Sequence, residues 1–264
     1  MGEVSCRYEG EGGRLAVVTI ANPSKLNAMS RHMWQQLRYV FNSISGNKYA
    51  GCVLIHGEKL GEKFADLTAF SAGGDISEYP SFRFNEVSLR DFHENDVWGG
   101  LQAMLACDVP IVAQIEGACM GAGLEIASCC DIRVAGASAK FGAPIAKLGF
   151  PMAPKEAEVV IRAVGELTAR EMLLEAAVLD AATMLQRGFL NLVVADADAA
   201  SSAMQSVNRI LALAPQAAKL NKQTFRSFNT LNPTPNPYTY AESAEHQEGI
   251  SAFIAKRKPV WNQE

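Results

Sequence analysis

The strongest chemical feature of the sequence is a glycine-rich segment that ends two residues before a glutamate. Residues 117–123, GACMGAG, follow an apolar run at 111–115 and lead into a second one at 124–130, which contains Glu125. N–H groups at the start of a helix have no partner within the helix, so they can hold an oxygen that gains negative charge during a reaction. Apolar neighbours raise the pKa of a carboxyl group towards the range useful for acid/base catalysis. This spacing predicts an oxyanion hole beside a catalytic carboxyl group.

An oxyanion hole needs a second donor, and the loop at residues 71–75, SAGGD, can supply it because small residues let a backbone approach a ligand closely. Two other interpretations of residues 117–123 stay open. Glycines between a strand and a helix can hold a dinucleotide pyrophosphate, although this turn lies in mid-chain and the sequence has no Tyr-x-x-x-Lys pair. They can also serve only a tight turn and close helix packing.

Alternating strand and helix patterns surround these segments. Apolar runs predict strands at residues 15–20, 51–55, 111–115 and 131–135. Between them, Ser30 can cap a helix with an apolar face, and residues 87–107 are predicted to be helical. This alternation favours an α/β layered core.

The pattern changes after Pro151. Helices are predicted at residues 155–164, 168–174, 181–187, 199–213 and 241–256, with one strand at 192–194 and a proline-rich loop at 232–237. We therefore predict an α/β core over residues 1–190 and a helical region over residues 191–264.

Composition narrows the class of protein. The net charge of −4 indicates no nucleic-acid partner, and no apolar run is long enough to cross a membrane. Residues 1–6 lack the features of a signal peptide, so we expect a cytoplasmic protein. The six cysteines form no C-x-x-C pair and are expected to be reduced, and neither they nor the four histidines show metal-ligand spacing.

An ordered set of motifs resembles the crotonase superfamily, the enoyl-CoA hydratase/isomerase family. The two signature regions are FSAGGDI at 70–76 and IEGACMGAGLE at 115–125, followed by CDI at 130–132. Matching segments cover nearly the whole chain: PSKLNA at 23–28, AKFG at 139–142, RAVG at 162–165, EGISAF at 248–253 and KRK at 256–258.

The resemblance implies a spiral of strand–strand–helix turns with a helical C-terminal trimerisation region, and a homotrimer or a dimer of trimers. It implies an acyl-CoA thioester as substrate, with no metal and no further cofactor. By motif position, the N–H groups of Gly74 and Ala122 would form the oxyanion hole and Glu125 would be the acid/base. The family usually has glycine where Ala122 stands, and alanine keeps the donor where its φ is permitted. The positions that would contact coenzyme A are Lys25, Leu26, Ala28, Ala72, Asp75, Ile76, Phe253 and Lys256, of which Asp75 is also expected to brace its loop.

One expected residue is missing. Hydratases of this family use two glutamates, and the second would stand where this chain has Ile145. Glu156 or Glu158 could replace it, although both fit a solvent-facing first turn of a helix. His93 lies in the segment that often lines the acyl pocket, and is expected to be a surface residue.

The sequence therefore predicts an enzyme that stabilises a thioester enolate and moves protons with Glu125. Hydration of an enoyl-CoA is the first hypothesis. Because Ile145 replaces a carboxylate, double-bond migration, decarboxylation of a malonyl-type thioester, thioester hydrolysis and non-catalytic acyl-CoA binding remain alternatives. The acyl chain itself is not readable from the sequence, although residues 80–98 are expected to shape its pocket.

Overall fold

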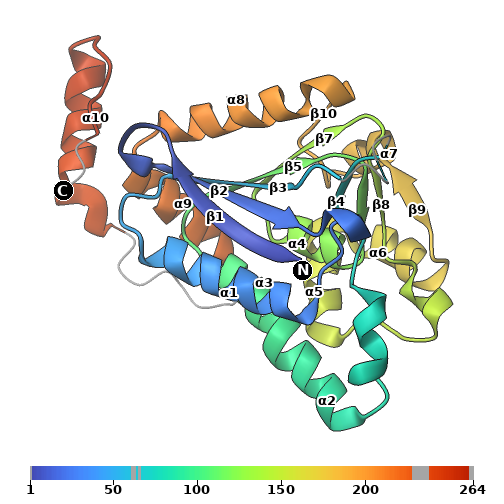
Figure 1. The fold of residues 1–264 in the computed structure, drawn as a ribbon. Coiled ribbons are helices and arrows are strands. Elements are labelled where there is room, and N and C mark those ends of the chain that lie inside the picture. Colours follow the sequence, from blue (N-terminus) through green and yellow to red (C-terminus); the bar gives the residue numbers. More distant parts are fainter. Residues whose placement is uncertain (1, 61–63, 65–66, 228–237, 262–264) are drawn as a thin grey trace.

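A six-stranded sheet forms the centre of the protein in the computed structural model, which describes residues 2–60, 64, 67–227 and 238–261 (Figure 1). Its order is β1-β2-β3-β5-β7-β10, and only β1 runs antiparallel to its neighbour. The strands are β1 (Glu3–Glu9), β2 (Leu15–Ala21), β3 (Cys52–Gly57), β5 (Ile111–Ile115), β7 (Ile132–Gly136) and β10 (Leu192–Val194). The inner strands β2, β3 and β5 are buried along nearly their whole length, which is why they read as continuous apolar runs.

A second sheet of short strands, in the order β4-β6-β8-β9, stands beside the first. Its strands are β4 (Ala69–Ser71), β6 (Ala118–Met120), β8 (Lys140–Gly142) and β9 (Val178–Asp180). In the first turn, β1 and β2 both join the main sheet before α1; the next three turns each contribute one strand to each sheet and then a helix, as in β5, β6 and α4 (Ala122–Ser128). The strand–strand–helix spiral predicted from the sequence is confirmed.

Helices cover the main sheet on both sides (Figure 1). α1 (Arg31–Gly46) and α3 (Trp98–Ala106) pack together on one face, and α8 (Ala199–Leu211) lies on the other, against β3, β5 and β7. Ser30 caps α1 as predicted, because its side chain accepts a hydrogen bond from the N–H of Met33 at 3.2 Å. The other helices are α2 (Glu86–Asp91), α5 (Pro154–Val164), α6 (Glu166–Leu174), α7 (Ala181–Gln186), α9 (Pro215–Ser227) and α10 (Ala244–Ile254).

Several elements differ from the sequence predictions. β1 and the four strands of the second sheet were not predicted, and β9 contradicts the expectation of a single strand after Pro151. Three-residue strands are too short to show a period of two. α9 was also missed, and the stretch predicted as one helix at 87–107 contains a π-helical turn, η5 (Phe92–Val97), between α2 and α3. The proline-rich loop at 232–237 lies outside the described residues.

The strand at 192–194, assigned to the C-terminal region by the sequence, pairs with β7 inside the main sheet. α8 follows it onto the sheet. The final helix, α10, stands clear of this body (Figure 1). No helix among the described residues is long and apolar enough to cross a membrane.

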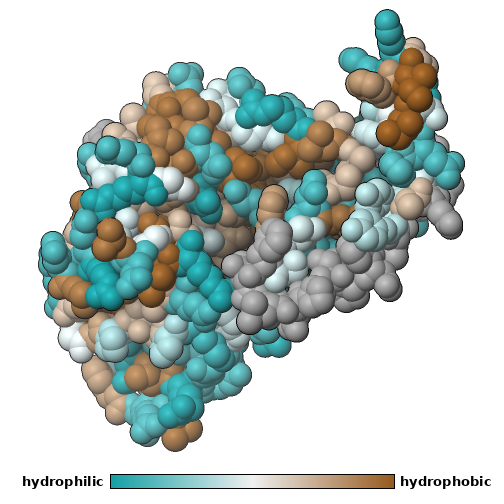
Figure 2. All heavy atoms as spheres, turned by 180° about the vertical axis from the view of Figure 1, so that it is seen from behind, coloured by the Kyte–Doolittle hydropathy of each residue, from teal (hydrophilic) through white to brown (hydrophobic). Residues whose placement is uncertain are grey.

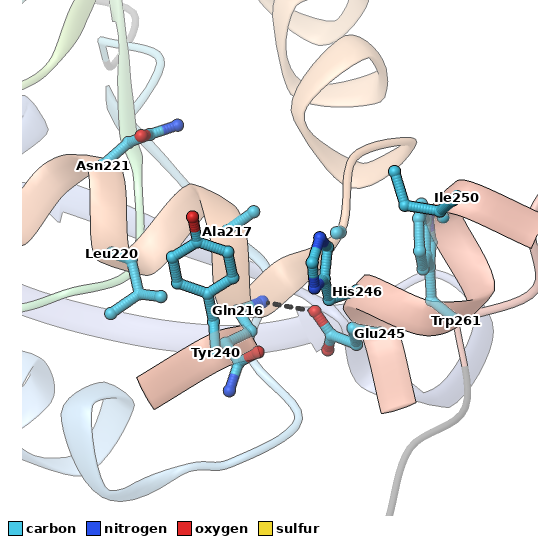
Figure 3. A pocket seen from close by; sticks show the side chains of 11 residues that line it. Gln216, Ala217, Leu220, Asn221, Tyr240, Glu245, His246, Ile250 and Trp261 are labelled. Atoms are coloured by element: carbon cyan, nitrogen blue, oxygen red, sulfur yellow. Dashed lines mark hydrogen bonds between the residues drawn. The ribbon is translucent and has the colours of Figure 1, made fainter. Parts of the chain in front are cut away.

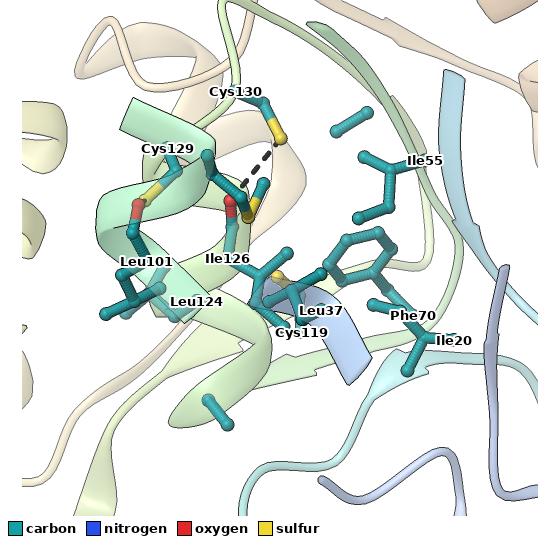
Figure 4. Packing of buried hydrophobic residues seen from close by; sticks show 14 of the residues in the cluster. Ile20, Leu37, Ile55, Phe70, Leu101, Cys119, Leu124, Ile126, Cys129 and Cys130 are labelled. Carbon is teal, nitrogen blue, oxygen red and sulfur yellow. Dashed lines mark hydrogen bonds between the residues drawn. The ribbon is translucent and has the colours of Figure 1, made fainter. Parts of the chain in front are cut away.

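Helix α4 is embedded in the hydrophobic core (Figure 4). Leu124 and Ile126 have no exposed surface, and the thiols of Cys129 and Cys130 face the backbone carbonyls of Leu101 and Ile126. Burial raises the pKa of the Cys130 thiol to about 12. Those buried sulfurs act as packing groups, and the core around them fixes the position of the first turn of α4.

Candidate active site

The loop around Gly74 and the first turn of α4, which holds Ala122 and Glu125, line the same small cavity, of about 50 Å³. Gly121 precedes α4 with a φ of +45°, a conformation that favours glycine. Ala122 is the first residue of α4 and has helical backbone angles, so the permitted φ that alanine requires is present. Its N–H is one of those that have no intrahelical partner.

The Gly74 loop is held by hydrogen bonds to Met29. The N–H of Met29 donates to the carbonyl of Gly73, and the N–H of Asp75 donates to the carbonyl of Met29, both at 2.8 Å. Because successive backbone groups of an extended segment alternate in direction, the N–H of Gly74 points to the opposite side. Close packing brings this loop and α4 together, since a Cβ added to Gly123 would lie 2.7 Å from the carbonyl oxygen of Ser71.

Glu125 is 7% exposed and lies in the first turn of α4. Burial raises the pKa of its carboxyl group well above the ordinary value of 4.5, and the charge of Glu156 raises it further, while Arg83 opposes the shift. A carboxyl group with a raised pKa keeps its proton to higher pH, and a protonated carboxyl group can act as a general acid.

A second buried carboxyl group, Glu156 on α5, lines the same cavity and is 4% exposed. The expectation that it faces solvent was wrong. Glu156 lies three and four residues before Val159 and Val160, so it shares the buried face of α5, and this helical spacing was the signal that the sequence offered. Glu158 is off this face and forms an exposed ion pair with Arg162 at 2.5 Å.

His93 also belongs to this site and is not a surface residue, because its side chain is 16% exposed. Its Nδ1 lies 2.6 Å from Oε1 of Glu156. The π-helical turn η5 positions the ring, and such turns are frequent at functional sites. Nε2 of His93 lies 3.5 Å from an Nη of Arg83, which can only donate; this favours the tautomer in which Nδ1–H donates to Glu156.

Apolar and aromatic side chains complete the cavity. Ile145, at the position of the missing glutamate, lies within its lining. The remaining lining residues are Trp34, Tyr79, Arg83, Phe92, Val97, Gly121, Phe150, Pro151 and Met152. Apolar walls lower the local dielectric constant, which strengthens electrostatic interactions inside.

The residues predicted to contact coenzyme A fall into two groups. Leu26, Ala28 and Ala72 lie beside the Gly74 loop, where the N–H of Ala72 donates to the carbonyl of Leu26 at 3.0 Å. Asp75 accepts hydrogen bonds from Lys25 Nζ at 2.6 Å and from Ser77, so it braces the loop. Ile76 follows on the exposed side.

Phe253 and Lys256, by contrast, lie on and just after α10 and line no part of this cavity. A separate cavity of about 390 Å³ lies between α9 and α10 (Figure 3). There Glu245 accepts a hydrogen bond from the N–H of Gln216 at 2.7 Å, and Leu220, Ile250 and Trp261 provide apolar walls. It shares no lining residue with the cavity around Glu125. Among the described residues, no group of three or more His, Cys, Asp or Glu side chains could hold a metal ion.

Comparisons with known proteins match the chain over nearly its full length. A family model described as enoyl-CoA hydratase/isomerase matches residues 10–264. A short-chain-enoyl-CoA hydratase of Clostridium acetobutylicum is 31% identical over 253 residues, which cover 93% of each chain. The crystal structure of an enoyl-CoA hydratase/carnithine racemase from Magnetospirillum magneticum superimposes with a TM-score of 0.92 at 32% identity, covering 100% of this chain and 97% of that one. The crystal structure of an enoyl-CoA hydratase/isomerase family protein from Hyphomonas neptunium superimposes with a TM-score of 0.86 at 27% identity, covering 98% of each chain.

Proposed function

The chain belongs to the enoyl-CoA hydratase/isomerase family, and on that premise we propose that it hydrates a 2-enoyl-CoA thioester with two carboxyl groups, Glu125 and Glu156. The family and crotonase-like fold predicted from the sequence are confirmed, and the chain is an enzyme of this hydratase/isomerase type. The observation that carries the proposal is that both buried carboxyl groups line one cavity together with Gly74 and Ala122.

In this proposal the thioester carbonyl accepts hydrogen bonds from the N–H groups of Gly74 and Ala122. As water adds to the β-carbon, negative charge moves onto this oxygen. Preorganised backbone donors stabilise that charge, and loss of one such donor typically costs ~3 kcal/mol of activation free energy. Acyl-CoA is the substrate, and no further cofactor takes part.

The two carboxyl groups have different tasks because their surroundings differ. Glu125, neutral through its raised pKa, donates a proton to the α-carbon. Glu156, whose Oε1 accepts a hydrogen bond from His93, takes the proton of the attacking water. In this proposal Glu156, on α5, takes the role of the second family glutamate, at whose position this chain has Ile145.

A second candidate is double-bond migration with Glu125 as the only base. The contact between Glu156 and His93 favours it, because a carboxylate held at 2.6 Å by a histidine has fewer lone pairs free for water. In that reaction Glu125 would carry one proton between the α- and γ-carbons, and Glu156 would only position His93.

Three variants separate these candidates. The loss of conjugated-enoyl absorbance of a short 2-enoyl-CoA is followed with Glu125→Gln, Glu156→Gln and the control Glu158→Gln, which changes an exposed carboxylate on the same helix. We expect both buried-site variants to lose about 10²- to 10⁴-fold in kcat, with the control unchanged. Exchange of α-hydrogens of a saturated acyl-CoA in D₂O, which needs one base, should be lost in Glu125→Gln alone.

Each outcome has a clear meaning. Full hydration activity in Glu156→Gln would exclude the two-carboxyl mechanism. Absence of hydration by the wild-type protein, with migration of the double bond of a 3-enoyl-CoA, would assign the isomerase reaction.

A further inference from the structure

We propose that Arg83 binds a carboxylate at the far end of the acyl group, so that the substrates are short CoA half-thioesters of dicarboxylic acids. This inference rests on the proposed function for the identity of the reacting thioester. The reaction chemistry specifies the thioester end of the substrate, and Arg83 would select the other end of the acyl group in the same cavity.

The guanidinium of Arg83 is placed like a binding group. Its Cζ lies 3.7 Å from the ring centroid of Phe150 and 4.4 Å from that of Tyr79, so aromatic faces hold it in the cavity lining. Its Nε is buried and has no hydrogen-bond partner among the residues that the structure describes. A buried donor without a partner is costly, so the surrounding protein leaves part of the hydrogen-bonding capacity of Arg83 unused.

Neither carboxyl group of the cavity forms an ion pair with Arg83. The carboxylate of Glu156 is engaged by His93 at 2.6 Å, whereas Arg83 contacts the neutral partners His93 Nε2, at 3.5 Å, and Tyr79. Burial raises the pKa of the Glu125 carboxyl group and so opposes a negative charge there. Arg83 is therefore the cation in this lining that has no carboxylate of its own among the described residues.

Tyr79 connects Arg83 with the proposed oxyanion hole. A Cβ added to Gly74 would lie 2.1 Å from the Tyr79 hydroxyl, and the ring of the same tyrosine lies against Arg83. One tyrosine side chain thus spans the distance from the thioester carbonyl to the guanidinium. The two ends of the acyl group would therefore lie along one tyrosine side chain, which favours a short acyl chain.

The guanidinium of Arg83 has the geometry to bind a carboxylate. A guanidinium presents a planar fork of donors that binds a carboxylate through two parallel hydrogen bonds. An uncharged acyl end would leave the half-buried guanidinium without an anion, so we expect the cavity to discriminate against it.

The test compares two substrates of equal chain length and similar size. One is the CoA half-thioester of 2-pentenedioic acid, and the other is 5-methyl-2-hexenoyl-CoA, in which two methyl groups replace the carboxylate oxygens. We expect kcat/KM of the wild-type protein to be about 10- to 100-fold higher for the dicarboxylic substrate. Arg83 also acts on the pKa of Glu125, so Arg83→Gln is judged by the ratio of the two kcat/KM values, and we expect that ratio to fall to about 1. Arg90→Gln, which changes an exposed arginine paired with Glu86, serves as control.

Binding separates this inference from the proposed reaction. Calorimetry with the saturated analogues, glutaryl-CoA and 5-methylhexanoyl-CoA, needs no turnover. Tighter binding of glutaryl-CoA, lost in Arg83→Gln, would support the subsite even if neither enoyl substrate were hydrated. Equal binding of both analogues by the wild-type protein, or an equal loss of both in Arg83→Gln, would overturn it.

Discussion

The carboxyl group of Glu125 is buried, and burial opposes its ionisation. The charge of the neighbouring Glu156 opposes ionisation further, so the pKa of Glu125 is raised. The group is free to ionise in the unfolded chain near its ordinary pKa of 4.5 but holds its proton to higher pH in the folded protein. A raised folded-state pKa gives stability that is present below the unfolded pKa and is lost as the pH rises through the folded pKa. The site thus trades stability at neutral pH for an acid that can donate a proton.

This linkage predicts the behaviour of Glu125→Gln. Because glutamine cannot ionise, the variant should gain free energy of unfolding relative to the wild type as the pH rises above about 4.5, so the difference at pH 8 should exceed that at pH 5. Urea unfolding at pH 5 and pH 8 measures the difference. Glu158→Gln, at an exposed site, should show no such trend. A constant offset between Glu125→Gln and the wild type at both pH values would contradict the prediction.

At the scale of elements, the site depends on the close approach of α4 and β4. Ser71 and Gly123 meet so closely that an added Cβ would lie 2.7 Å from a backbone carbonyl oxygen, and a backbone atom cannot move aside cheaply. The same contact fixes the separation between the N–H groups of Gly74 and Ala122. Packing and catalysis are therefore linked at a single residue.

We expect Gly123→Ala to lower the free energy of unfolding by about 1–3 kcal/mol through overpacking. It should also reduce kcat, because the two donors move apart, while affinity for the CoA portion of the substrate changes less. Chemical denaturation and the enoyl-CoA assay measure the two effects. Gly46→Ala is the matched control, since a Cβ there meets no atom within 4 Å. A Gly123→Ala variant as stable and active as the wild type would show that the approach is not tight.

Sequence patterns predicted the elements that carry strong local signals. The runs at 15–20 and 111–115 and the Ser30 cap are found in the structure, because burial on both faces and capping leave clear residue patterns. The glycine-rich segment and Glu125 were placed together correctly. β6, in contrast, lies inside that glycine-rich segment and is defined only by pairing with β4 and β8.

The other part of the site could not be assembled from local patterns. Glu156 and His93 are separated by 63 residues, and their contact depends on how α5 packs beside η5. The helical phase of Glu156 indicates burial, but nothing local indicates its partner. Arg83 gave no signal at all, since its environment is made by Tyr79 and Phe150 from different segments.

At the scale of the whole molecule, the body supplies one cavity while α10 projects away from it (Figure 1). Apolar side chains lie along this helix and face solvent (Figure 2). Phe253 is 83% exposed and Ile254 74% exposed. Exposed apolar groups that are clustered in this way mark contact surfaces. The resemblance to the crotonase superfamily implies that a neighbouring copy of the chain covers them, and that Phe253 and Lys256 approach the coenzyme A of that copy.

We therefore expect the protein to assemble into trimers or pairs of trimers, and Phe253→Asp to weaken that assembly. Burial of a phenylalanine contributes about 2–3 kcal/mol, so its loss at each contact should raise the dissociation constant by roughly 10²-fold. Sedimentation at several concentrations measures the mass, and circular dichroism checks that the variant is folded. Phe84→Asp is the control, because Phe84 is 87% exposed near α2, away from α10. A wild-type protein that is monomeric at all concentrations, or a Phe253→Asp variant with unchanged mass, would contradict this role of α10. If assembly and CoA affinity fall together in Phe253→Asp, the neighbouring copy completes the binding site.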